Sequence, residues 1–93
     1  MQRALDHAFS SKPNVKGILI SDGNGLCIAA KGDQEVSPDK SGRYSSIAKL
    51  AADLSSDPNE TSPSILIETD DRNLLVKEYD AMVIVLSCTK SEN

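Results

Sequence analysis

The chain has 93 residues, a formal net charge of -4 and a sequence pI near 4.8, which favours one domain (residues 1–93) with one modest core and argues against a nucleic-acid partner. No apolar run reaches the roughly 20 residues that span a bilayer, so we expect no direct membrane insertion. Two cysteines are too few for a disulfide scaffold, and the start lacks the apolar core of a signal peptide, so a cytoplasmic protein is expected.

The first elements expected along the chain are a short helix and a β-hairpin. Residues 2–11 carry a single apolar edge at helical spacing, with Phe9 as its anchor against a sheet. Residues 15–21 are rich in β-branched side chains and predict a strand. The sequence D-G-N-G at residues 22–25 predicts a tight turn, because Gly and Asn tolerate positive φ angles, and residues 26–31 then form the returning strand.

The longest segment with a helical period follows, from Ser37 to Asp57. Ser37 is a plausible N-cap, and Pro38 suits the first helical position because its missing N–H is not needed there. Pro58 disfavours helical geometry at the residue before it and ends the helix. We therefore expect one central helix over residues 37–57.

Two stripes run along this helix. One consists of large apolar side chains and is expected to pack on the chain's own sheet: Tyr44, Ile47, Leu50, Ala51 and Leu54. The other consists of small side chains: Ser41, Ser45, Ala48, Ala52 and Ser55. Because small side chains allow another backbone to approach closely, we expect this second stripe to face a partner helix. A small-residue face that is merely solvated is the alternative.

Three further strands are predicted in quick succession, at residues 64–69, 73–78 and 81–88. Their connections of two or three residues require antiparallel neighbours, so the fold class is α+β with an antiparallel meander. The last strand is apolar on both faces, which implies cover on both. The first of the three is expected at a sheet edge and has little charge to protect it, so it invites pairing with another chain.

No pattern in the sequence indicates catalysis, a metal site or a cofactor. The single histidine, His7, lies among surface positions, and Cys27 and Cys88 stand alone. The D-G-N-G turn lacks the remainder of a calcium loop, and no dinucleotide or Walker motif is present. The sequence therefore disfavours an enzyme and predicts no metal ion and no cofactor.

Three pieces of the sequence resemble one protein family. They are G-I-L-I-S-D-G-N-G-L (residues 17–26) with K-G after it, L-A-A-D-L-S-S-D-P (residues 50–58), and E-T-D-D-R-N-L-L-V-K-E-Y-D-A-M-V-I-V (residues 68–85). Their order and spacing resemble the roadblock-type subunits of the Ragulator complex known as the hepatitis B virus X-interacting protein family. The resemblance runs from about Val15 to Leu86. None of the pieces is a catalytic signature, because each is a structural segment.

The resemblance implies a roadblock/longin-like fold with a five-stranded antiparallel sheet, a central helix and a short N-terminal helix, without a C-terminal helix. It also implies a non-catalytic scaffold subunit that forms a heterodimer with a second roadblock subunit. A lipid-anchored subunit would wrap this pair and hold it peripherally on the late endosome or lysosome. There the complex would support Rag GTPases and amino-acid activation of mTOR complex 1.

For the dimer contact we predict one set of residues on the helix and one on the edge strand: Ser41, Tyr44, Ser45, Ala48, Ala52, Ile65, Leu66 and Ile67. In this interpretation Ala48→Glu weakens assembly and spares the isolated fold. Two other interpretations stay open. One is a homodimeric roadblock protein, such as a GTPase regulator or a motor light chain. The other is a small ligand-sensing domain of profilin-like or PAS-like topology, for which few polar residues line the strands.

Overall fold

The computed structural model describes residues 14–54 and 63–90. The helix predicted over residues 2–11 lies outside these residues. The elements in chain order are β1 (Val15–Asp22), β2 (Cys27–Gly32), the 3-10 turns η1 (Gln34–Val36) and η2 (Pro38–Lys40), α2 (Ser41–Ala52), β3 (Ser64–Glu68), β4 (Arg72–Tyr79) and β5 (Met82–Thr89).

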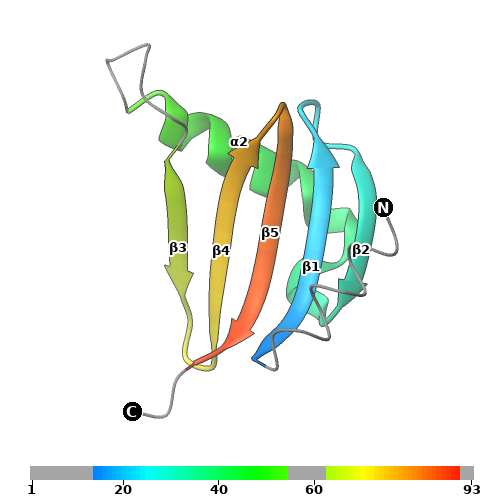
Figure 1. Ribbon diagram of the computed structural model, residues 1–93, viewed down its shortest axis with the longest axis vertical. Helices are drawn as coiled ribbons and strands as arrows, with labels where there is room; N and C mark the ends of the chain where they lie inside the picture. The colour runs from blue at the N-terminus through cyan, green and yellow to red at the C-terminus, as the bar shows by residue number, and fades with distance from the viewer. Residues whose placement is uncertain (1–13, 55–62, 91–93) are drawn as a thin grey trace.

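The five strands form one antiparallel sheet in the order β2-β1-β5-β4-β3. Helix α2 crosses one face of this sheet, with its C-terminal end on the β3 side (Figure 1). The predicted five-stranded antiparallel sheet is confirmed, and so is the position of the first strand of the meander at a sheet edge.

The β1–β2 connection is the tight turn that its sequence predicts. One carboxylate oxygen of Asp22 accepts hydrogen bonds from the backbone N–H groups of Asn24, at 2.8 Å, and Leu26, at 3.0 Å. Gly25 has a φ of +89°, a conformation that costs glycine little. The returning strand begins at Cys27, one residue later than predicted, because Leu26 still belongs to the turn.

The central helix is shorter than its sequence pattern predicts. Ser37 has an extended backbone and precedes the 3-10 turn η2, but its hydroxyl donates to the Asp39 carboxylate rather than capping a backbone N–H group. The α-helix therefore begins only at Ser41 and ends at Ala52, with Asp53 as its C-cap. The predicted end at Asp57 lies outside the described residues.

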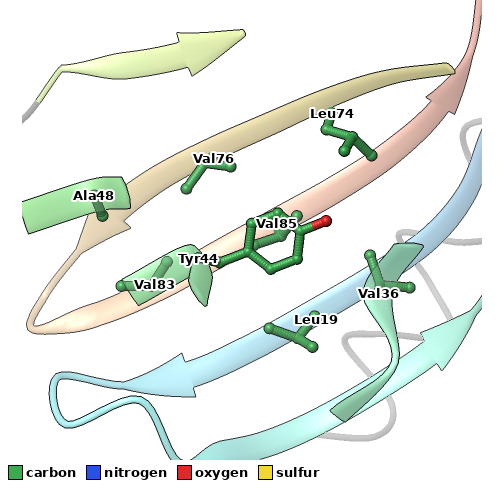
Figure 2. Packing of buried hydrophobic residues seen from close by; sticks show 8 residues of the cluster. All are labelled: Leu19, Val36, Tyr44, Ala48, Leu74, Val76, Val83 and Val85. Carbon is green, nitrogen blue, oxygen red and sulfur yellow. The ribbon is translucent and has the colours of Figure 1, made fainter. Parts of the chain in front are cut away.

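The core lies between α2 and the sheet. Paired residues in register across four strands form a row on this face: Ile65, Val76, Val85 and Leu19. Figure 2 shows the labelled strand side chains meeting Tyr44 and Ala48 of the helix and Val36 of η1. The largest completely buried members are aliphatic, so this side of the sheet holds the hydrophobic core.

The opposite face of the sheet is apolar too, but it is unevenly buried. Its central row consists of Ile18 on β1, Leu86 on β5, Leu75 on β4 and Leu66 on β3, each paired with the next. Ile18 is only 6% exposed, whereas Leu75 is 39% and Leu66 53% exposed. Exposed apolar surface on this face therefore increases toward the β3 edge.

Candidate partner-binding surfaces

The helix stripe of small residues faces the chain's own sheet. Ser41, Ser45 and Ala48 are all buried, with exposed fractions of 6%, 4% and 3%. The Ser45 hydroxyl hydrogen-bonds the buried Ser21 hydroxyl at 3.0 Å, and the Ser41 hydroxyl donates to the carbonyl oxygen of Gly25 at 2.5 Å. The prediction that this stripe is free to face a partner is wrong for these three residues.

Close packing of backbones explains why small residues lie inside. A Cβ atom built on Gly25 would stand only 3.1 Å from the Cα of Gly42, so the start of α2 lies directly against the β1–β2 turn. Large side chains on the inner face would force the helix away from this turn. Helical periodicity alone does not carry this information, because it defines two stripes without deciding which of them the sheet can accept.

Tyr44 is the one large side chain at the centre of the inner face. Its ring lies in the core (Figure 2), and its hydroxyl donates to the carbonyl oxygen of Glu35 at 2.6 Å. Burial raises the pKa of the Tyr44 hydroxyl above its ordinary value, and the negative charges of Glu35 and Asp33 raise it further. Tyr44 is one of the predicted contact residues, but in this chain it is inaccessible to a partner.

The outer side of the helix exposes two leucines. Leu50 is 68% exposed and Leu54, just beyond the helix, is 87% exposed, so the prediction that both pack on the chain's own sheet is wrong. Ile47 is partly buried against the core, and Ala52 is half-buried. The C-terminal part of α2 thus presents unpartnered apolar side chains.

Strand β3 is an unpaired sheet edge on the same side of the molecule as the end of α2 (Figure 1). Ile65 and Ile67 are half-buried against the helix-side core, whereas Leu66 points to the other face and is exposed. We call Leu50, Leu54 and β3 together the helix–edge surface. Of the predicted contact residues, the three on β3 belong to it.

A second candidate surface lies on the sheet face opposite α2. Tyr79 is 65% exposed there, and a shallow hollow of about 310 Å³ extends beside it. We call this feature the open-face hollow; its lining residues are Ser64, Leu75, Val76, Lys77, Tyr79, Ile84 and Leu86. Exposed apolar patches of this kind mark interaction sites.

A polar cluster joins the segment before α2 to the sheet. One carboxylate oxygen of Asp33 accepts hydrogen bonds from Arg72 Nε, at 3.2 Å, and from the buried Ser87 hydroxyl, at 2.8 Å. Burial raises the pKa of the neighbouring Cys88 thiol, with a further contribution from the Asp33 charge. Sequence patterns did not reveal this cluster, because its members are 39 and 54 residues apart and no local pattern links them.

Within residues 14–54 and 63–90, no three histidine, cysteine, aspartate or glutamate side chains gather closely enough to hold a metal ion. In the same ranges, no helix has the length and apolar character needed to cross a membrane.

Solved structures define the class to which this fold belongs. A Roadblock/LC7 domain from Streptomyces avermitilis matches with a TM-score of 0.76 and 12% identity, covering 90% of this chain and 73% of that one. The gliding protein MglB from Thermus thermophilus matches with a TM-score of 0.72 and 14% identity, covering 95% of this chain and 70% of that one. MglB of Myxococcus xanthus has a TM-score of 0.68 and 18% identity over 82% of this chain and 60% of its own. The chain has the roadblock/LC7 fold.

The family within this class follows from the sequence. A family profile described as Ragulator complex protein LAMTOR5 matches residues 1–88, and the chain belongs to that family. The resemblance to roadblock-type Ragulator subunits is confirmed.

Proposed function

We propose that this chain is a non-catalytic scaffold subunit of a lysosomal Ragulator-type complex. In this role it pairs with a second roadblock subunit and supports Rag GTPase-dependent, amino-acid activation of mTOR complex 1. Family membership supports the complex, and the helix–edge surface is the structural observation that carries the pairing. It combines exposed leucines with a sheet-edge strand, and both features are typical of surfaces that pair with another chain.

The proposed dimer contact differs from the one predicted from sequence. Leu50 and Leu54 replace the buried small residues on the helix, while Ile65, Leu66 and Ile67 on β3 are retained. Burying a leucine completely contributes about 1.5–3 kcal/mol, so these side chains provide a substantial part of the association energy. Pairing along β3 adds backbone hydrogen bonds and orients the partner.

The open-face hollow is proposed as the contact for the lipid-anchored wrapping subunit. Its lining is mainly aliphatic with Tyr79 at the side, which suits the apolar face of an amphipathic segment. The membrane anchor of that subunit would hold the complex peripherally on the late endosome or lysosome. Rag GTPases are reached through the complex.

The double variant Leu50→Glu/Leu54→Glu tests the pairing. Both side chains are exposed, so the isolated chain should keep its circular dichroism spectrum and its unfolding midpoint. We expect recovery of the second roadblock subunit in a pull-down from native lysate to fall strongly. The matched control is Ile28→Glu on β2, at the opposite edge of the sheet, where the side chain is 47% exposed.

Undiminished recovery by the double variant would exclude the helix–edge surface as the contact. Light scattering on the purified chain separates the alternatives: a tight dimer of one chain would favour a homodimeric roadblock protein over a heterodimer.

A further inference from the structure

The segment that precedes α2 combines a serine, a proline and a lysine in close succession. It reads Ser37-Pro38-Asp39-Lys40, a serine followed by proline and, at the third position after the serine, by lysine. Proline-directed protein kinases select a proline directly after the phosphorylated serine. Proline suits that place because it has no N–H group that would be left unpaired in the substrate groove of the kinase. Many of them also favour a basic residue two positions further on. The other Ser-Pro pair, Ser62-Pro63, has Ile65 at that place.

The backbone around Ser37 is suited to a kinase groove, in which substrates lie extended. Ser37 has φ -66° and ψ 148°, an extended conformation, and it separates two short 3-10 turns. Pro38 and Asp39 are exposed, and Ser37 and Pro38 border a hollow of about 220 Å³ instead of lying under another element. Ser37 itself is half-buried, whereas Ser46 is exposed but held inside α2.

For Ser37 to bind in an extended groove, the 3-10 turns on either side of it have to open, and Val36 next to it has to leave the core. The Ser37 N–H donates to the carbonyl oxygen of Gln34 at 3.2 Å, and the Lys40 N–H donates to the carbonyl oxygen of Ser37 at 3.0 Å. Isolated 3-10 turns of this kind have poor hydrogen-bond geometry and open easily. The Ser37 hydroxyl donates to the exposed carboxylate of Asp39 and makes no contact with the core through this hydrogen bond.

We propose that Ser37 is a phosphorylation site for a proline-directed serine/threonine kinase. In the transfer, Ser37 Oγ forms a bond to the γ-phosphorus of Mg-ATP, and the bond between that phosphorus and the β–γ bridging oxygen breaks. ADP leaves with the bonding electron pair, and the hydroxyl proton passes to the catalytic base of the kinase. The product is phosphoserine and ADP.

The phosphate would change the charge of the segment that leads into α2. In the unmodified chain the Ser37 hydroxyl donates to Asp39, and this hydrogen bond is the main cause of the lowered pKa of the Asp39 carboxyl, with Lys40 and Arg43 contributing less. Phosphorylation removes that donor and places about -1.5 to -2 charges beside Asp39. The pKa of the Asp39 carboxyl should therefore rise in the phosphorylated chain.

The test uses the full native chain, Mg-ATP and a purified cyclin-dependent kinase, with phosphate located by mass spectrometry. We expect phosphate on Ser37 that Ser37→Ala removes. Pro38→Ala should lower the rate by about tenfold or more, the discrimination that one contact in a substrate pocket supplies. Lys40→Ala should lower it severalfold, and Ser62→Ala is the matched control that leaves labelling of Ser37 unchanged.

Three results would overturn the proposal. The first is total labelling that Ser37→Ala does not reduce. The second is labelling of Ser37 that withstands both Pro38→Ala and Lys40→Ala; the lysine variant keeps the test valid if the proline variant loosens the start of the helix. The third is efficient labelling of a synthetic peptide of residues 31–45 when the native chain is not labelled.

Discussion

At position 48 a methyl group is buried between helix and sheet. Ala48 is 3% exposed and contacts the core on the inner face of α2, whereas Leu50, two residues later, is 68% exposed. Ala48→Leu should therefore lower the free energy of unfolding by about 1–3 kcal/mol through overpacking. Leu50→Ala should change it by less than about 0.5 kcal/mol. Urea unfolding of both variants measures the difference, and equal effects would contradict the assignment of the two faces.

The burial of the small-residue stripe also corrects the expected effect of Ala48→Glu. A carboxylate at the inner face would be buried without a partner, so the substitution should unfold the chain rather than spare it. The sequence could define the two stripes but not choose between them. The choice depends on the close approach of Gly42 to Gly25 and on the Ser21–Ser45 hydrogen bond, both of which are contacts between distant segments.

Tyr44 should make stability depend on alkaline pH. Because the pKa of Tyr44 is raised in the folded chain, its contribution is complete below the ordinary value of 10.0 and is lost as pH rises through the folded pKa. Tyr44→Phe also removes the hydrogen bond to Glu35, and at pH 8 it should destabilise the chain by about 1–3 kcal/mol. Urea unfolding from pH 8 to pH 11 should show that the difference in unfolding free energy between the unmodified chain and Tyr44→Phe becomes smaller above pH 10. A constant difference would contradict the effect.

At the scale of elements, local signals predicted the strands well. The D-G-N-G turn and the alternation of side chains place β1, β2 and the β3–β4–β5 meander to within a residue or two. The last turn shifts by one residue, since Asp80 and Ala81 adopt the positive φ angles of 52° and 64°. Alanine rarely adopts a positive φ angle, so the sequence did not predict a turn at Ala81.

Strand β3 should gain protection when the partner binds. Among residues 14–54 and 63–90, β3 pairs with β4 on one side and with no strand on the other, and amides on that free side are expected to exchange with solvent in the isolated subunit. Adding the second roadblock subunit should slow hydrogen exchange across residues 64–68 by pairing that edge. Strand β2, the other sheet edge, serves as the internal control and should be unchanged. Protection at β2 instead of β3 would mean that the partner pairs with the other edge of the sheet.

At the scale of the whole molecule, the two apolar surfaces meet at β3 and extend from it in different directions. The helix–edge surface extends from β3 to Leu50 and Leu54 on the outer side of α2, whereas the open-face hollow extends over β4 and β5 on the opposite face of the sheet. Ser64 of β3 belongs to both surfaces. Stable interfaces bury about 1,200–2,000 Å² in total, which a few leucines on one surface do not provide alone. In the proposed function, one partner would therefore extend the sheet at β3 and another would bind its open face.

Positions outside β3 allow the effects of the two surfaces to be distinguished by mutation. Leu75→Asp places a charge beside the open-face hollow, at a position that is 39% exposed in the isolated chain. It should lower recovery of the lipid-anchored subunit while the second roadblock subunit is still recovered. Leu50→Glu should mainly lower recovery of the second roadblock subunit. Quantitative pull-downs of both proteins with each variant measure the pattern. Loss of both partners with Leu75→Asp, in a chain whose unfolding midpoint is unchanged, would mean that the two surfaces act as one interface.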